Sequence, residues 1–138
     1  MREIFTAYTD GGSRGNPGKA AIGGVIFDSS GLEIFRYKKF LGINTNNFAE
    51  YSSLIFALEK SLDMGIKDLL CISDSELLVK QINGEYKVKS ENLKMLFEKV
   101  LALIKKFRSF EIRHQKREND GIKTADLLVN EALDENHV

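Results

Sequence analysis

The sequence has few of the features that mark secreted, membrane-spanning or zinc-binding proteins. Its single cysteine, Cys71, cannot form an internal disulfide, which favours a reducing, cytoplasmic location. No apolar run approaches the roughly 20 residues that a membrane helix needs, and the N-terminus lacks the basic-then-apolar pattern of a secretory signal. The two histidines and one cysteine provide no set with zinc spacing. Tryptophan is absent, and proline occurs once, as Pro17.

The totals fit one compact α/β domain, and we expect it to cover residues 1–138. A length of 138 residues allows a sizeable core but is short for two domains. Lys/Arg and Asp/Glu are equal in number, but residues 80–117 carry 11 basic and 4 acidic residues, whereas residues 118–138 carry 1 and 6. The basic segment hints at a polyanionic partner, although a solvated helix face is the simpler explanation of the charge taken alone.

Hydrophobic periodicity predicts five strands and four helices. The expected strands cover residues 4–9, 20–28, 32–41, 68–73 and 110–114. The expected helices cover residues 47–64, 75–82, 91–107 and 124 onward. The order βββαβααβα, an antiparallel start followed by alternating strands and helices, predicts a mixed sheet with helices on both faces. Gly23-Gly24 inside the second strand indicates either a closely packed neighbour or a bend.

The segment from Thr9 to Gly18 combines a carboxylate with a glycine-rich turn. We expect the first strand to end there, so that Asp10 stands at its end, before four glycines and Pro17. Glycine lets a backbone approach another molecule closely, and a carboxylate beside such a loop suits a metal ion. The alternative is an ordinary turn, in which the aspartate bonds to its own backbone.

Three more acids occupy similar positions, and each has a structural alternative. Glu50 lies in the first turn of a predicted helix, where a capping box would direct it to the amide of Asn47. Asp74 follows the buried fourth strand and could cap the next helix. Asp126 is expected in the first turn of the last helix, where the helix dipole favours a negative charge.

Taken together, the four acids predict a site for hard cations. Ligands in open sheets collect beyond the carboxyl ends of parallel strands, where Asp10 and Asp74 lie if the first and fourth strands are parallel neighbours. Carboxylates held this close repel one another unless cations neutralise them. Mg²⁺ prefers hard oxygen ligands and can share a substrate phosphate, and two such ions suit an in-line phosphoryl displacement.

The motifs around these acids resemble those of type 1 ribonuclease H, in the order found in that family and across nearly the whole chain. The matching segments are Thr9–Gly18, Thr45–Tyr51, Ser73–Ser75 and Ala125–Asn130. The resemblance implies the ribonuclease H fold, an α/β architecture with a five-stranded mixed sheet whose third strand is antiparallel, on the side away from the later strands. It also implies endonucleolytic cleavage of the RNA strand of an RNA–DNA hybrid with two Mg²⁺ or Mn²⁺ ions.

The resemblance also implies roles for individual residues. The metal ligands would be Asp10, Glu50, Asp74 and Asp126, with Glu50 also meeting the 2′-OH beside the scissile phosphate. Contacts to the minor groove and backbone would come from Gly11, Gly12, Asn16, Asn46 and Asn47, with Thr45 near a DNA phosphate. His114 would match the mobile histidine that assists product departure or proton transfer, and its alternative is an exposed strand-end residue.

The chain departs from the family pattern in two places that bear on turnover and binding. The segment from Gln115 to Thr124 is longer than usual before Ala125-Asp126. The basic protrusion of larger bacterial members is missing, so Lys87, Lys89 and Lys94 would supply part of the phosphate contact.

The sequence therefore predicts a cytoplasmic, monomeric hydrolase, with no membrane or protein partner, that cleaves RNA–DNA hybrids to 5′-phosphate and 3′-hydroxyl ends. Two alternatives stay open at this stage. One is a hybrid-binding domain that has lost turnover. The other is a related nuclease acting on double-stranded RNA or on RNA–DNA junctions.

Overall fold

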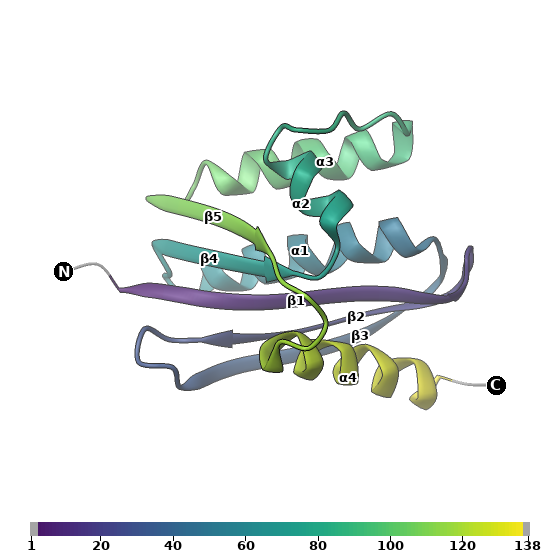
Figure 1. The fold of residues 1–138 in the computed structure, drawn as a ribbon, viewed down its shortest axis with the longest axis horizontal. Helices are drawn as coiled ribbons and strands as arrows, with labels where there is room; N and C mark the ends of the chain where they lie inside the picture. Colours follow the sequence, from purple (N-terminus) through teal and green to yellow (C-terminus); the bar gives the residue numbers. More distant parts are fainter. Residues whose placement is uncertain (1–2, 137–138) are drawn as a thin grey trace.

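The computed structural model describes residues 3–136, which form one five-stranded sheet with helices on both faces (Figure 1). The strands are β1 (Ile4–Gly15), β2 (Gly18–Phe27), β3 (Glu33–Asn44), β4 (Asp68–Ser73) and β5 (Ser109–His114). The helices are α1 (Asn46–Asp63), α2 (Glu76–Ile82), α3 (Glu91–Ile104) and α4 (Asp120–Glu135). The predicted order of elements is confirmed.

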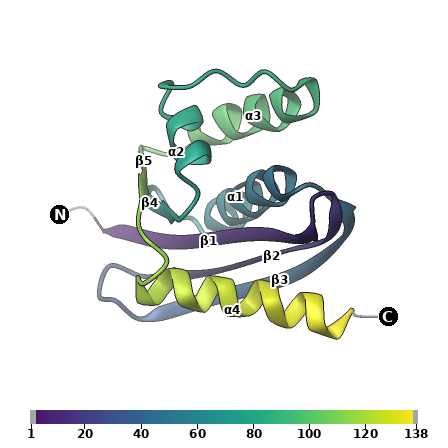
Figure 2. The same ribbon diagram turned by 45° about the vertical axis from the view of Figure 1, so that its right-hand side comes forward.

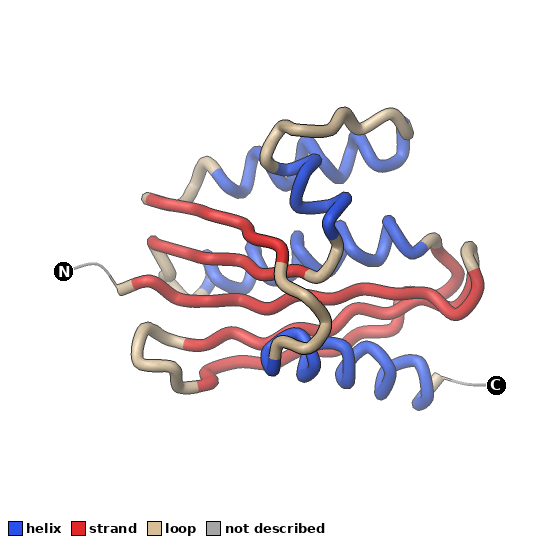
Figure 3. The backbone as a smooth tube through the Cα atoms, viewed as in Figure 1, coloured by secondary structure: helices blue, strands red, loops and turns tan. Residues whose placement is uncertain are grey.

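The sheet is mixed, with strand order β3-β2-β1-β4-β5 (Figure 3). β2 pairs antiparallel with both β1 and β3, while β4 pairs parallel with β1 and with β5. The first and fourth strands are thus parallel neighbours, which meets the condition under which Asp10 and Asp74 were expected to lie together. β3 lies at the edge away from β4 and β5, and β2 is the strand that runs against the other four.

The prediction that the first strand ends at Thr9 was wrong. β1 continues to Gly15 and stays paired with β2 as far as Gly18, so the glycine-rich segment is mainly hairpin. Glycine tolerates extended backbone as well as turns, and Gly15 alone within β1 has a positive φ, at 92°. The pairing between β1 and β4 ends at Thr9 and Ser73. β1 therefore extends past the end of β4, and Asp10 lies at that step.

Helices cover the two faces of the sheet unequally. α4 lies alone on one face, against β1, β2 and β3, while α1 covers the other face and is covered in turn by α3 (Figure 2). The larger core lies between the sheet, α1 and α3, and it includes Leu54, Leu58 and Val100, all fully buried. The apolar face of α4 makes a smaller core with Ala21.

The lone cysteine is part of the larger core. Cys71 is 0% exposed, in a central strand between β1 and β5, and burial raises the pKa of its thiol. This position confirms the interpretation of Cys71 as a small core residue. Within residues 3–136, no helix combines the length and hydropathy needed to cross a bilayer.

An ion pair between the buried Asp68 and the half-exposed Arg108, at the opposite end of β4, gives a stability prediction. Arg108 Nε lies 3.1 Å from both carboxylate oxygens of Asp68, which is 1% exposed and also accepts a hydrogen bond from Ser109 Oγ at 2.7 Å. Removing Arg108 takes one charged partner away from a buried carboxylate. We expect Arg108→Ala to lower the free energy of unfolding by about 1–3 kcal/mol in urea titrations.

The matched control is Arg113→Ala, because Arg113 pairs with Glu111 on the same strand with both side chains 55% exposed. Exposed pairs contribute less than about 1 kcal/mol. Equal losses for the two variants would mean that the Asp68 pair has no special weight.

Candidate active site

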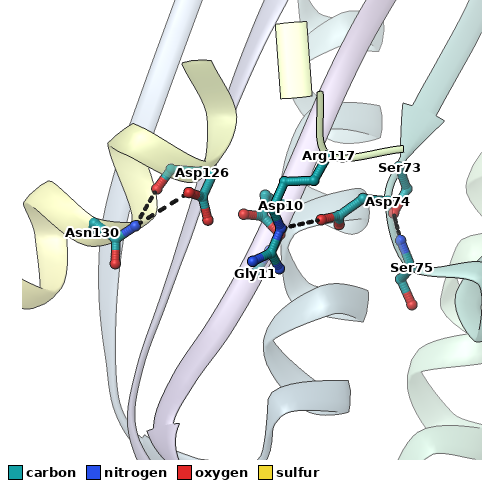
Figure 4. A network of polar contacts seen from close by, with 8 residues as sticks. All are labelled: Asp10, Gly11, Ser73, Asp74, Ser75, Arg117, Asp126 and Asn130. Carbon is teal, nitrogen blue, oxygen red and sulfur yellow. Dashed lines mark hydrogen bonds and ion pairs between the residues drawn. The ribbon is translucent and has the colours of Figure 1, made fainter. Parts of the chain in front are cut away.

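Four acids from different elements meet where β4 ends. Asp10 is in β1, Glu50 in the second turn of α1, and Asp74 directly after β4; one carboxylate oxygen from each lies within 4.8 Å of the others. Asp10 lies between Asp74 and Asp126, and Asp126 is close enough to hydrogen-bond to it (Figure 4). A cavity of about 200 Å³ is lined by Asp10, Glu50 and Asp126.

The structural alternatives for three of these acids were wrong, because neighbouring residues cap the helices. Thr45 Oγ1 accepts from the amide of Phe48 at 3.1 Å, so the cap is Thr45 and not Asn47, α1 begins at Asn46, one residue before the expected position, and Glu50 is not part of a cap. Ser75 caps α2 in place of Asp74. Asn119 caps α4, which begins at Asp120 rather than near Thr124.

The early start of α4 also changes the position of Asp126. Asp126 lies in the second turn of the helix, beyond the first turn in which the helix dipole acts on a side chain. The segment after His114 is consequently shorter than the sequence suggested, since its second half is helix. None of the three helix ends therefore accounts for the acid beside it.

Gly11 lets β1 and α1 approach closely enough to place Glu50. A Cβ at Gly11 would lie 2.3 Å from the carbonyl carbon and oxygen of Ala49 and 2.6 Å from the Glu50 nitrogen. The Gly11 amide also donates to Asp10 Oδ1 at 2.9 Å. One glycine thus orients Asp10 and leaves room for the backbone that carries Glu50.

The acids perturb one another strongly. Burial, followed by the charges of Asp74 and Asp126, raises the pKa of Asp10 to about 8. Burial is also the main cause that raises the pKa of Glu50 well above its usual value, with Asp10 and Asp74 adding to it. Such shifts arise when like charges are held together away from water.

This donor set fits divalent ions such as Mg²⁺ or Mn²⁺. All donors are hard carboxylate oxygens, and a bound cation would relieve the repulsion that raises these pKa values. Asp10, Glu50 and Asp74 offer the tightest grouping, and Asp126 extends it on the α4 side.

Arg117 is a site residue that sequence reasoning missed. It lines the cavity, and its Nε lies 3.4 Å from Asp74 Oδ2. Asp74 and Asp126 raise the pKa of Arg117, and the charge of Arg117 offsets part of the rise in the pKa of Glu50. The sequence feature that could have indicated Arg117 is a basic residue shortly after the last strand, in the segment that leads to Asp126. Its significance depended on where α4 begins.

Two further polar residues on this side were also missed. Asn130 Nδ2 donates to the backbone oxygen of Asp126 at 3.1 Å and lies 3.4 Å from its Oδ2, a pairing that the i, i+4 spacing in a helix allows (Figure 4). Arg14 Nη2 lies 3.4 Å from Asn130 Oδ1 and pairs with Asp134 at 2.7 Å.

His114 lies outside the group of residues that line the cavity. It is the last residue of β5, exposed, and paired in the ladder with Ser73. Ser73 directly precedes Asp74, so His114 lies beside the strand end that carries Asp74.

The expected substrate contacts form a connected rim next to the acids. Asn16 Oδ1 accepts from the Asn46 amide at 3.0 Å, and Asn46 Oδ1 accepts from the Ser13 amide at 3.2 Å. These bonds tie the β1–β2 hairpin to the start of α1. Gly11, Gly12 and Asn46 line the same cavity as the acids, whereas Asn16, Thr45 and Asn47 line the groove beside it.

The mixed sheet of this order, with its acids gathered at one edge, defines a ribonuclease H-like α/β domain. The family described as "Reverse transcriptase-like" matches residues 8–132. The chain is 39% identical to the ribonuclease HI of Halobacterium salinarum over 94% of its length, and the crystal structure of RNase H1 from that archaeon superposes with a TM-score of 0.91 at 38% identity, covering 96% of this chain and 98% of that one. The chain belongs to the type 1 ribonuclease H family.

Two other relatives show the range of the similarity. The structure of LC11-RNase H1 in complex with an RNA/DNA hybrid has a TM-score of 0.88 and 40% identity, over 95% of this chain and 97% of that one. A bifunctional protein of Mycobacterium tuberculosis is 36% identical over 97% of this chain. The chain spans 64% of the length of the curated Halobacterium protein and 36% of the mycobacterial one.

Repulsion among the acids predicts a pH-dependent stability of the metal-free protein. The pKa of Asp10 is about 8 in the folded protein against 3.8 for an unperturbed aspartate, so the folded state binds this proton more tightly. The stabilisation of the folded state by the proton on Asp10 is complete below pH 3.8 and is lost as the pH rises through 8. We expect Asp10→Asn, which keeps an acceptor for the Gly11 amide, to melt higher than the unmodified chain at pH 8 in EDTA, by about 3 °C or more.

The two chains should converge in melting temperature at pH 4, where Asp10 is protonated. Thermal unfolding followed by circular dichroism at both pH values measures the difference. A lower melting temperature for Asp10→Asn at pH 8 would show that the carboxylate stabilises the fold.

Proposed function

We propose that this chain is an endonuclease that hydrolyses the RNA strand of RNA–DNA hybrids and leaves 5′-phosphate and 3′-hydroxyl ends. The observation that carries the proposal is the grouping of Asp10, Glu50 and Asp74 within 4.8 Å, with Asp126 against Asp10. Such buried like charges destabilise the metal-free fold. Their function would be to hold the divalent cations that stabilise the reacting phosphate of a polyanionic substrate. The solved LC11-RNase H1 complex supports the hybrid as substrate.

The four carboxylates would hold two Mg²⁺ or Mn²⁺ ions. Bound there, such ions supply Lewis-acid stabilisation of the charge that develops on the phosphate and lower the pKa of a water. The residues contribute position: Asp10 is fixed by the Gly11 amide, and Asp126 is restrained by Asn130. Glu50 approaches from α1, and we assign it the additional contact with the ribose 2′-OH.

The rim beside the acids suits an RNA–DNA minor groove. The side chains of Asn16, Asn46 and Asn47 can donate to and accept from base edges and sugar hydroxyls without reading a sequence, and the 2′-OH distinguishes RNA from DNA. Thr45 and the glycine amides suit phosphate contacts that set the register. The Asn46 amide already donates to Asn16 Oδ1 and so joins the hairpin to α1, and this surface therefore needs little reorganisation to bind.

Arg117 would offset the negative charge of the site as the substrate phosphate approaches. It reaches the site from the connection between β5 and α4, where its guanidinium pairs with Asp74. A guanidinium can bind phosphate oxygens through two of its N–H groups at once. We assign this role to Arg117, and His114 remains a second candidate for assisting product departure.

Cleavage of an end-labelled hybrid tests the proposal, with Mg²⁺, with Mn²⁺ and with EDTA. We expect metal-dependent cuts within the RNA strand, products that accept a 3′ label and carry a 5′-phosphate, and no cleavage in EDTA or by Asp10→Asn. Matched single-stranded RNA, double-stranded RNA and RNA–DNA junctions serve as competing substrates. Preferred cleavage of the double-stranded RNA or of the junction would mean that the chain is a related nuclease with that substrate and not a ribonuclease H. Binding of the hybrid without cleavage, with Mg²⁺ and with Mn²⁺, would favour the alternative of a hybrid-binding domain that has lost turnover.

Substitution of Arg117 gives a prediction within this function. We expect Arg117→Ala to lower kcat by roughly tenfold to a hundredfold, because it removes a charge directed at the reacting phosphate. Arg117→Lys should keep much of the rate, since it retains the charge without the fork. Steady-state rates on a labelled hybrid measure both, with Arg113→Ala as the control on the neighbouring strand. A rate for Arg117→Ala within twofold of the unmodified chain contradicts the role.

We also propose that residues 1–138 act as a single catalytic domain, as a monomer and in the cytoplasm. The single sheet and the buried lone cysteine support these assignments. Size-exclusion chromatography with light scattering tests the monomer directly, and a mass near 31 kDa instead of the chain's 15.6 kDa would contradict it.

A further inference from the structure

We propose that Gly23 is a positioning residue for the nuclease reaction, because its missing side chain sets how closely α4, and with it Asp126, approaches Asp10. The proposal rests on the function assigned above. Gly23 is the partner of Asp10 in the β1–β2 ladder. Side chains of directly paired residues lie on the same face of a sheet, so the bare face of Gly23 lies beside the Asp10 side chain, on the side that α4 covers.

The contact between Gly23 and α4 leaves no room for a methyl group. A Cβ at Gly23 would lie 2.6 Å from the carbonyl oxygen of Ala125, 2.8 Å from Leu128 Cβ and 2.8 Å from the Val129 nitrogen. Two of these atoms belong to the backbone, and Ala125 directly precedes Asp126. Because van der Waals contact needs about 3.5 Å, a methyl group here requires that the distance between strand and helix increase by roughly 1 Å.

The helix, rather than the strand, can yield. β2 is held from its other face, where Ser53 Oγ of α1 donates to the Gly23 carbonyl at 3.1 Å and the Tyr37 ring lies where a Cβ of Gly24 would be. α4 packs on β1, β2 and β3, and its outer residues, such as Leu127 at 55% exposure, face solvent. A side chain at position 23 would therefore lift α4 away from the sheet.

Lifting α4 affects one acid and spares the other three. Asp10, Glu50 and Asp74 are carried by β1, α1 and the end of β4, and these elements are joined to one another by strand pairing between β1 and β4 and by the packing of α1 on β1. Asp126 alone would move away from Asp10. Displacing a reacting group by about 1 Å can cost roughly a hundredfold in rate. The rim that meets the substrate, on the hairpin and α1, stays in place.

The test is Gly23→Ala, compared with Ala21→Gly. Ala21 is fully buried against Val129, Ala132 and Leu133 of α4, so Ala21→Gly weakens the same interface without pushing it apart. We expect Gly23→Ala to lower kcat by tenfold to a hundredfold. Its KM, and its hybrid affinity measured by fluorescence anisotropy in EDTA, should change by less than twofold. Ala21→Gly should lower the melting temperature and keep kcat, with all rates measured well below the melting transition.

A second substitution separates displacement of Asp126 from general damage. Asp126→Glu adds about 1.5 Å of reach. We expect Asp126→Glu to lower kcat in the unmodified chain, and to raise it at least threefold when Gly23→Ala is already present. Equal effects in the two backgrounds, or a folded Gly23→Ala chain with kcat within twofold of the unmodified chain, overturn the proposal.

Ala21→Val is the alternative if Gly23→Ala does not fold, because it pushes on the same interface one turn further along α4. It should then lose activity and be rescued by Asp126→Glu in the same way, and a fully active, folded Ala21→Val would count against the proposal. Failure of the unmodified chain to cleave the hybrid would instead refute the proposed function.

Discussion

Repulsion between buried carboxylates is the constraint on which the rest of the site depends. Asp10 is 5% exposed and Glu50 is 7% exposed, and the elements that carry them are packed tightly enough to hold the two carboxyl groups close together. The large core between the sheet, α1 and α3 provides the stability that offsets this cost. Packing of the sheet against its helices thus fixes the positions of the carboxylates, and this arrangement favours catalysis by electrostatic preorganisation.

Separate residues perform the structural and the chemical tasks at the edge of the sheet. Thr45, Ser75 and Asn119 satisfy the first amides of their helices, each with a short side chain. The neighbouring acids Glu50, Asp74 and Asp126 therefore do not cap these helices. Glycines perform a second structural task, since Gly11 admits the backbone of α1 and Gly23 admits that of α4. The acids are thus brought together by residues that have no charge.

Much of this organisation could be predicted from the sequence, because it depends on periodicity and on local motifs. The order of elements follows from strand and helix patterns. The meeting of the acids was predicted on the condition that β1 and β4 are parallel neighbours, and the motifs around the acids supported it. The end of β1 could not be predicted, because glycine permits both turn and strand and the pairing partner β2 decides. The start of α4 was missed because Asn119 and Asp120 suit a loop as well as a cap, and the position of Arg117 depended on that start.

The burial of Cys71 has a practical consequence for following motions of this chain. Its thiol is enclosed in a central strand, and the chain has no other cysteine and no tryptophan. A thiol reagent can react only after β4 separates from its neighbours, so the labelling rate reports how often the middle of the sheet opens. A cysteine or tryptophan introduced at the surface would, for the same reason, give a signal without background from the native side chains.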